Sequence, residues 1–356
     1  MRVLTVIGNR PQFVKAAAVS GPLRERADEV LVHTGQHYDD ALSSVFFDEL
    51  GLPRPEHRLD LGGGSNTAQT ARMLAAIESL LHQERPDAVL VYGDTNSTLA
   101  GALAGAQAHI PVAHVEAGMR SFDMRMPEEL NRVLCDHAAS LLLCPSASAA
   151  ENLRAENVHG EVVVCGDVMV DVAALVAPAA RGRSDVCAAH GVTAGGYLLA
   201  TAHRAGNVDD PERLASLVDL LLGLPEPVVV PLHPRTRARL EAAERLDDLR
   251  GADHVHLSPP LGYVEFTALL QQARTVLTDS GGVQKEAYLA GVPCVTLRDS
   301  TEWVETVKTG WNVLVDLDAD AARGALARPL PASHPALYGD GRAGARVVEA
   351  LLRMVS

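Results

Sequence analysis

The sequence predicts an α/β protein built from two doubly wound parallel-sheet domains, and three observations support this fold class. Short apolar runs alternate with amphipathic stretches of helical length, which is the pattern of repeated strand–helix units. Several of these runs stop at a polar or charged residue, as strands do when their carboxyl ends line a ligand site. The length of 356 residues is sufficient for two such domains.

The first half of the chain contains six apolar runs of strand length separated by helix patterns. A clear helix pattern covers Thr67–Gln83. The expected strands are Val3–Ile7, Glu29–His33, Ala88–Tyr92, Val112–Val115, Leu141–Cys144 and Val162–Cys165.

A second series of strands follows an Ala/Pro/Gly-rich segment, 173–196, which fits an interdomain connection. We expect the first domain to span residues 1–168 together with a last helix at about 341–356, and the second to span 169–340. The expected strands of the second domain are Tyr197–Thr201, Pro227–Pro231, Val255–Leu257, Thr275–Thr278, Val292–Leu297 and Asn312–Val315.

The net charge, the cysteines and the apolar runs indicate which partners and which location to expect for the protein. A net charge of −14 disfavours nucleic acid or a membrane surface as a partner, because both would repel the chain. The five cysteines form no CxxC pair, which indicates buried reduced thiols and a cytoplasmic protein. The N-terminal apolar run is too short for a signal sequence, and no apolar stretch approaches the ~18 residues of a membrane span.

The sequence offers no motif for a dinucleotide or Walker-type ATP site, so no cofactor is expected. Ser280, Gly281 and Gly282 instead follow a strand and open a helix, where backbone N–H groups can bind an anion. The other polar residues that end apolar runs are Arg10, His37, Asp94, Glu116, His203 and His233.

Nine motifs together resemble the non-hydrolysing UDP-N-acetylglucosamine 2-epimerases: GNRPQFVK, TGQHYD, VYGDTNST, HVEAGMRS, MPEELNR, TAHRAGN, LHPRT, TDSGGVQKEA and TLRDSTEWVET. They occur in the order found in that family. The resemblance implies a GT-B-like fold, with two Rossmann-like domains facing a central cleft, and a homodimer. It also implies interconversion of UDP-GlcNAc and UDP-ManNAc without a metal or a redox cofactor.

This reaction needs a diphosphate clamp and proton transfer at C2 of the sugar. Loss of UDP makes the C2 hydrogen acidic and gives a glycal, and UDP adds back with protonation from the opposite face. Matching the family assigns proton transfer to Asp94, Glu116 and Glu128, with His203 also in the catalytic set. It assigns substrate binding to Arg10, Lys15, Gln36, His37, Arg120, Arg132, His233, Phe266, Ser280, Gly281, Gly282, Glu286 and Arg298.

Some of these residues have a structural alternative. Asp94 is a suitable N-cap for the helix that follows it. Phe266 lies in an apolar helix pattern and can be a core residue. Lys15, Arg120 and Arg132 either tune the carboxylates, hold the sugar or form surface ion pairs, and Glu286 can be an exposed helix carboxylate. His233 precedes a proline and can be structural.

Two positions depart from the family pattern. Tyr38 stands where many bacterial members have arginine in a loop of their second, activating UDP-GlcNAc site, so allosteric activation is not expected. Gly206 stands where glutamate usually follows the His-Arg motif, which opens the alternative of a modified substrate such as a UDP-diacetamido sugar or its uronate. A GT-B glycosyltransferase, a hydrolysing epimerase and a UDP-sugar sensor are the alternatives from other classes.

Overall fold

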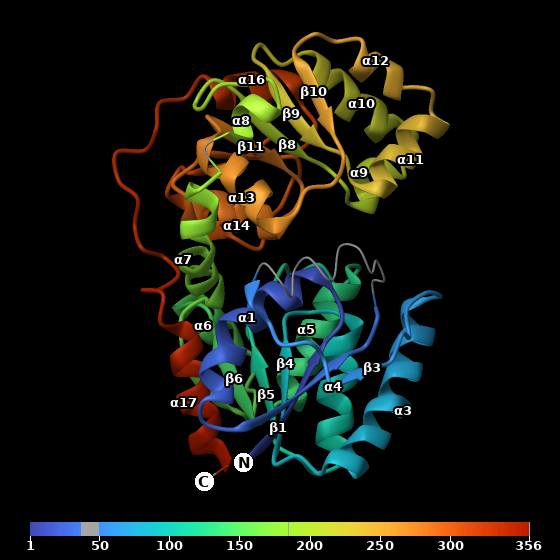
Figure 1. The fold of residues 1–356 in the computed structure, drawn as a ribbon, viewed down its shortest axis with the longest axis vertical. Coiled ribbons are helices and arrows are strands. Elements are labelled where there is room, and N and C mark those ends of the chain that lie inside the picture. Colours follow the sequence, from blue (N-terminus) through green and yellow to red (C-terminus); the bar gives the residue numbers. More distant parts are fainter. Residues whose placement is uncertain (37–49, 184, 356) are drawn as a thin grey trace. The chain divides into compact units, whose positions relative to one another are not determined.

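The protein is an all-parallel α/β structure in two compact units (Figure 1). The computed structural model describes residues 1–36, 50–183 and 185–355. Unit 1 comprises Met1–Leu175 and Ala336–Ser356, and unit 2 comprises Val176–Pro335. The predicted fold class, two Rossmann-like parallel-sheet domains, is confirmed.

Unit 1 contains a seven-stranded sheet in the order β3-β2-β1-β4-β5-β6-β7. Its strands are β1 (Arg2–Ile7), β2 (Asp28–His33), β3 (His57–Arg58), β4 (Ala88–Tyr92), β5 (Val112–Val115), β6 (Leu141–Cys144) and β7 (Glu161–Val164). Its helices are α1 (Arg10–Arg24), α3 (Asn66–Glu84), α4 (Asn96–Gln107), α5 (Pro127–Ala138), α6 (Ala147–Ala155) and α17 (Ala343–Val355).

Both faces of the central strands of this sheet are buried. Alternate residues such as Leu4 and Val6 pack under α3 and α4, whereas Thr5 faces α1. Helix α17 packs along α1, and both chain ends lie at the same end of unit 1 (Figure 1). A Cβ atom on Gly344 would lie 2.2 Å from the Ala18 carbonyl oxygen, so this contact between helices requires glycine.

Unit 2 contains a six-stranded sheet in the order β10-β9-β8-β11-β12-β13. Its strands are β8 (Leu198–Thr201), β9 (Val228–Pro231), β10 (Val255–Ser258), β11 (Thr275–Thr278), β12 (Cys294–Thr296) and β13 (Asn312–Leu314). Its helices are α8 (Val186–Ala189), α9 (Ala205–Val208), α10 (Pro211–Leu222), α11 (Pro234–Ala242), α12 (Leu246–Arg250), α13 (Tyr263–Gln272), α14 (Gly281–Leu289), α15 (Val304–Lys308) and α16 (Ala319–Leu326).

The segment expected as a connection is helical over its first part. Helix α7 (Val168–Arg181) crosses the boundary between the units, which falls at Leu175–Val176. Its residues Val172, Val176 and Ala180 recur every four positions and are buried. This apolar stripe keeps the segment helical despite Pro178 within the helix.

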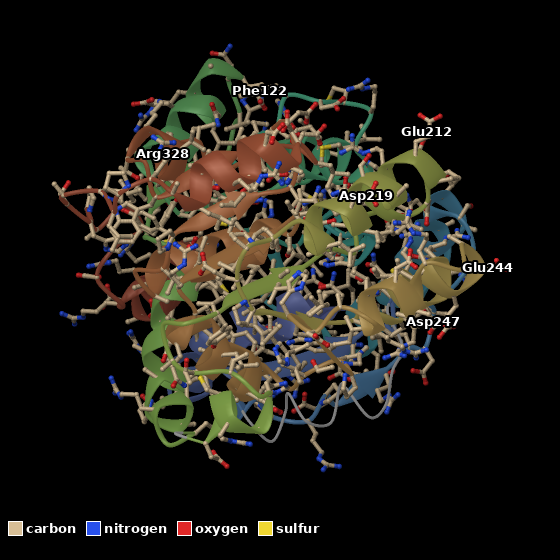
Figure 2. The ribbon with its side chains drawn as sticks, turned by 90° about the horizontal axis from the view of Figure 1, so that it is seen from above. Phe122, Glu212, Asp219, Glu244, Asp247 and Arg328 are labelled. Atoms are coloured by element: carbon tan, nitrogen blue, oxygen red, sulfur yellow. The ribbon has the colours of Figure 1, made fainter. Side chains whose placement is uncertain are left out.

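The surface and the cysteines agree with the composition. Carboxylates such as Glu212 on α10 and Glu244 after α11 are exposed and project outward (Figure 2). All five cysteines are buried and unpaired. In the described part of the chain, no helix combines the length and the apolarity needed to cross a membrane.

Candidate active site

Each sheet reverses its strand order at one point, and the predicted site residues gather beside these points. In unit 1 the order reverses between β1 and β4, and in unit 2 between β8 and β11. Parallel α/β sheets bind ligands at such switch points, outside the carboxyl ends of the strands. Arg10 and Asp94 follow the two strands of the first point, and His203 and Ser280 follow those of the second.

The loop after β1 is held tightly against α4. A Cβ atom on Gly8 would lie 2.0 Å from Ser97 Oγ, so no larger residue fits without a shift. The Asn9 side chain caps α1 by accepting a hydrogen bond from the Gln12 N–H at 3.3 Å. Arg10 is the first residue of α1 and is half-buried. The tight loop therefore fixes the backbone from which the Arg10 side chain extends.

Asp94 does not cap the helix that follows it. Thr95 is the N-cap of α4, and it forms a reciprocal capping box with Thr98. The Asp94 carboxylate instead accepts a hydrogen bond from Arg132 Nη2, with Oδ2 at 2.5 Å. The structural alternative from the sequence, in which Asp94 is the cap, is therefore wrong.

Arg132 joins Asp94 to a second, buried carboxylate that the sequence analysis missed. Arg132 Nη1 lies 2.9 Å from Glu129 Oε2, and the Glu129 side chain is 1% exposed. Burial raises the pKa of Glu129, but the backbone N–H groups of Ser121 and Phe122 and the Arg132 guanidinium outweigh it and hold the pKa below its usual value. Glu129 therefore remains an anion that anchors Arg132.

Glu128, the neighbouring carboxylate that was predicted to act in proton transfer, is exposed in the first turn of α5. Helix α5 buries a polar stripe, formed by Glu129, Arg132 and Asp136, and exposes Leu130 and Leu134. The spacing of the stripe, i, i+3 and i+7, is a signal in the sequence that identifies a helix facing a polar site.

Glu116 follows β5 with its backbone in the left-handed region, at φ 73°. This conformation is uncommon for a residue other than glycine and persists where the surrounding structure enforces it, often at functional sites. Its carboxylate forms an ion pair with Lys15 of α1. A Cβ atom on Gly93 would lie 3.2 Å from Lys15 Nζ and 3.3 Å from Glu116 Oε2, so the pair lies directly against the turn before Asp94.

The remaining candidates of unit 1 have different surroundings. Gln36 accepts hydrogen bonds from the Ser97 N–H at 3.0 Å and from Ser97 Oγ at 2.7 Å. His37 lies outside the described residues. Arg120 is buried, with its guanidinium bound to Asp136 and to both carboxylate oxygens of Glu156.

In unit 2, His203 and His233 lie together beyond β8 and β9. Their rings stack at a centroid distance of 5.2 Å. His203 is 40% exposed, and its backbone N–H donates to the fully buried Asp279. His233 Nδ1 accepts a hydrogen bond from the Arg235 N–H, which leaves the Nε2 position to carry the proton. Two imidazole rings are thus presented at the carboxyl ends of adjacent strands.

The start of α14 lies beside further polar groups. Ser280 is its N-cap, and Gly281 lies close to Trp303, Glu302 and Arg204. Arg298 forms a two-point ion pair with Glu302, at 3.1 and 3.2 Å. Burial raises the pKa of Glu302, but the hydrogen bond from Arg298 and the nearby charges outweigh it and lower the pKa overall. Arg298 is therefore held rigidly near the helix start, and Arg204, which was not predicted, approaches the same place.

Asp279 and Glu286 complete the arrangement in unit 2. Asp279 also accepts hydrogen bonds from the Arg204 N–H and from Asn207, so it fixes the turn that carries His203. Glu286, on α14, accepts a hydrogen bond from the Tyr263 hydroxyl at 3.3 Å. Phe266 is 8% exposed on α13, as expected of a core residue.

The two switch points offer different chemistry. Unit 1 presents carboxylates paired with cations, which is suited to proton transfer. Unit 2 presents imidazoles and the backbone N–H groups of a helix start, which are suited to a phosphate group. Within the described residues, no group of three His, Cys, Asp or Glu side chains could hold a metal ion.

Comparisons with known proteins identify the family to which the chain is similar. Residues 22–352 match the family described as UDP-N-acetylglucosamine 2-epimerase. The chain is similar to the UDP-2,3-diacetamido-2,3-dideoxy-D-glucuronate 2-epimerase of Pseudomonas aeruginosa, at 47% identity over 99% of this chain and 100% of that protein. It is 40% identical to the UDP-N-acetylglucosamine 2-epimerase of Methanocaldococcus jannaschii, over 99% of each chain.

A solved structure supports the same likeness at the level of the fold. The crystal structure of the M. jannaschii UDP-GlcNAc 2-epimerase in complex with UDP-GlcNAc and UDP superposes with a TM-score of 0.92 and 39% identity, over 99% of this chain and 100% of that one.

Proposed function

Because the chain belongs to the UDP-N-acetylglucosamine 2-epimerase family, we propose that it inverts C2 of a UDP-linked N-acetylhexosamine by eliminating UDP and adding it back. The first candidate reaction interconverts UDP-GlcNAc and UDP-ManNAc through 2-acetamidoglucal. The observation that carries the proposal is the pair of cation-bound carboxylates, Asp94 and Glu116, that follow neighbouring strands of unit 1.

The proposed mechanism divides the work between proton transfer and leaving-group stabilisation. Asp94, Glu116 and Glu128 supply the base and the acid for the two faces of C2, with Lys15 and Arg132 setting their charge. Arg10, His203 and the N–H groups of Ser280–Gly282 stabilise the negative charge that develops on UDP as the C1–O bond breaks. His233, Gln36 and Arg298 support substrate binding.

Glu286 and Phe266 are proposed contacts of the nucleoside. A carboxylate accepts hydrogen bonds from ribose hydroxyls, and Tyr263 already holds the Glu286 carboxylate in place. We propose that the enzyme acts in the cytoplasm as a homodimer, by likeness to the family.

A specific observation favours a second substrate, a UDP-diacetamido uronic acid. Gly206 lies on α9, two residues beyond Arg204, and an added Cβ atom there would meet nothing within 4 Å. The absence of a carboxylate at this open position removes a repulsion toward an anionic sugar. The relative of 47% identity, from P. aeruginosa, is named for such a substrate.

Proton NMR in D2O tests the proposal with both substrates. We expect the C2 hydrogen to exchange with solvent and the signals of the epimer to appear, without free sugar. The substrate with the larger kcat/KM identifies the preferred sugar. Release of free N-acetylmannosamine would instead indicate a hydrolysing enzyme, and binding of UDP without exchange of the C2 hydrogen of either sugar would refute the proposed reaction.

The variant Gly206→Glu tests whether the residue at position 206 influences which sugar the enzyme prefers. The added carboxylate is expected to lower kcat/KM for the uronate more than for UDP-GlcNAc, because only the uronate carries a second anionic group. Gly206→Gln, of nearly the same shape, is the matched control. An equal effect of both variants on both sugars would mean that position 206 does not influence the choice.

A further inference from the structure

His114 lies within β5, two residues before Glu116, and its side chain is only 1% exposed. Each of its ring nitrogens approaches an oxygen at 2.7 Å: Nδ1 faces Asp136 Oδ1, and Nε2 faces the Gly93 carbonyl oxygen. A carbonyl oxygen only accepts hydrogen bonds, so Nε2 must carry a proton.

Whether the second ring nitrogen, Nδ1, carries a proton depends on whether Asp136 is ionised. Its other carboxylate oxygen accepts hydrogen bonds from the Gly118 N–H at 3.0 Å and from Arg120 Nη1 at 2.7 Å. Burial raises the pKa of Asp136, but His114 and Arg120 outweigh it and hold the pKa below its usual value. Because its Oδ2 accepts from the Arg120 guanidinium and from a backbone N–H, Asp136 is a carboxylate. Its Oδ1, at 2.7 Å from His114 Nδ1, requires a donor, so Nδ1 also carries a proton.

Either neutral form of the ring would leave a buried repulsive contact. With Nδ1 unprotonated, two lone pairs would face each other toward Asp136, and with Nε2 unprotonated the same would occur toward Gly93. The charges around the ring also balance the imidazolium. Asp136 and Glu156 are the anions, Arg120 is the other cation, and His137 contacts Glu156 at 3.6 Å from the partly exposed side.

The ring connects the two turns that carry the proposed proton-transfer groups. Gly93, at φ 65°, immediately precedes Asp94. Through Asp136, the ring also reaches the N–H of Gly118, which ends the turn containing the left-handed Glu116. The hydrogen bonds of one buried cation thus fix the backbone beside both carboxylates.

We propose that His114 is a positioning residue, a buried imidazolium that holds the turns of Asp94 and Glu116 at their working separation through Gly93 and Asp136. The expected effect of His114 on turnover rests on the proposed function. The positive charge of the His114 ring is inferred from its hydrogen bonds alone and does not depend on that function. Proton transfer depends steeply on such placement, since a displacement of about 1 Å can cost ~10²-fold in rate.

The first test measures the charge in the intact wild-type protein. Histidine labelled with ¹⁵N is examined by NMR at neutral pH, where the charged and neutral forms of the ring give different nitrogen signals. The signal of His114 is assigned by its loss in His114→Asn. We expect both ring nitrogens to be protonated, and a neutral tautomer in the folded protein overturns the proposal.

The second test measures placement through kinetics. His114→Asn and Asp136→Asn are each expected to lower kcat by about 10-fold or more with little change in KM, and the double variant to be no worse than the more impaired single variant, because the two residues act as one unit. Thr5→Val is the matched control. It removes a buried hydrogen bond of 2.8 Å to Glu29 in the same sheet, away from the carboxylates, and should keep kcat.

Two kinetic outcomes would overturn the positioning role: unchanged kcat in folded His114→Asn, or an equal loss of kcat in Thr5→Val. If His114→Asn does not fold, the positioning role is tested by kcat of Asp136→Asn and the charge by the wild-type NMR spectrum. The His114 signal is then assigned through its contacts with neighbouring residues. Absence of epimerisation by the wild-type protein would refute the proposed function but would leave the protonation result standing, so the two failures are distinguishable.

Discussion

Two neighbouring residues, Asp94 and Thr95, allow chemistry to be separated from stability. The structure assigns capping of α4 to Thr95 and an ion pair with Arg132 to Asp94. We therefore expect Asp94→Asn to lower turnover by ~10²-fold or more, as for loss of a proton-transfer group. We expect Thr95→Ala to leave turnover close to that of the wild type.

The expected stability effects follow from the contacts. Asn at position 94 retains an oxygen that can accept from Arg132, and Arg132 remains paired with Glu129 at 2.9 Å, so no buried charge is left alone. Since Asp94 is 29% exposed, the cost in unfolding free energy should be about 0.2–1 kcal/mol, as for a partly screened pair. Thr95→Ala removes an N-cap and should cost about 1 kcal/mol, or roughly 2–4 °C in the melting temperature of unit 1.

The assay combines proton exchange at C2 by NMR with urea unfolding. Asp28→Asn is the control, because it makes the same chemical change in an Asp–Arg pair, at 2.7 Å from Arg2, at the opposite ends of the strands. It should change neither turnover nor UDP binding. Near-wild-type turnover in Asp94→Asn, accompanied by the larger loss of stability, would refute the assignment of roles to these two residues.

Three further predictions concern the loop after β1, the diphosphate site and pH. Gly8→Ala should destabilise unit 1 by about 1–3 kcal/mol in urea unfolding and weaken UDP binding, because its Cβ atom would lie 2.0 Å from Ser97 Oγ. Gly21→Ala, where nothing lies within 4 Å, should instead be neutral or stabilising, and equal effects of the two would contradict this reasoning. Arg10→Ala and His203→Ala should each weaken UDP binding by roughly 1.5–3 kcal/mol in calorimetry, as for a charge-assisted hydrogen bond to phosphate, and unchanged affinity in both would place the nucleotide elsewhere. The pKa values of Glu129 and Asp136 are lowered in the folded protein, so both carboxylates stabilise the fold. Their contribution to stability is complete above about pH 4–5, where these carboxyls ionise in the unfolded chain. It is lost as the pH falls through their lower pKa values in the folded protein. The urea midpoint of unit 1 should therefore fall between about pH 5 and pH 2, and Glu129→Gln should reduce this dependence; a midpoint independent of pH would show that these carboxyls do not stabilise the fold.

Sequence patterns predicted the strands well because buried parallel strands are apolar throughout. Ala88–Tyr92 and Thr275–Thr278 agree with the structure residue for residue. Strand β3 was missed, since its two residues, His57 and Arg58, form no apolar run and are defined only by pairing with β2. Helix α7 was interpreted as a connection because alanine, proline and glycine dominate the composition there, although its buried stripe repeats every four residues.

The positions of the candidate residues in the fold were predictable where a residue ends a strand, but less so where the burial of a side chain depends on distant partners. Asp94 and His203 end apolar runs and were identified for that reason. Glu129 and Asp136 were not, because a carboxylate is stable in the core only when donors from elsewhere in the chain surround it, here Arg132, Arg120 and backbone N–H groups. Motif matching placed Arg120 in the substrate site, whereas the structure engages its guanidinium with Asp136 and Glu156.

Packing of α17 against α1 has a consequence for synthesis of the chain. Residues 1–175 emerge from the ribosome before the helix that covers α1, while residues 176–335 form unit 2 as one uninterrupted block. Unit 2 can therefore complete its core during translation, whereas unit 1 completes its packing only when residues 343–355 emerge and cover one flank of α1. During that interval the nascent chain exposes the surface of α1 that α17 later covers, so we expect a chain that lacks residues 343–355 to be less stable in unit 1 than in unit 2.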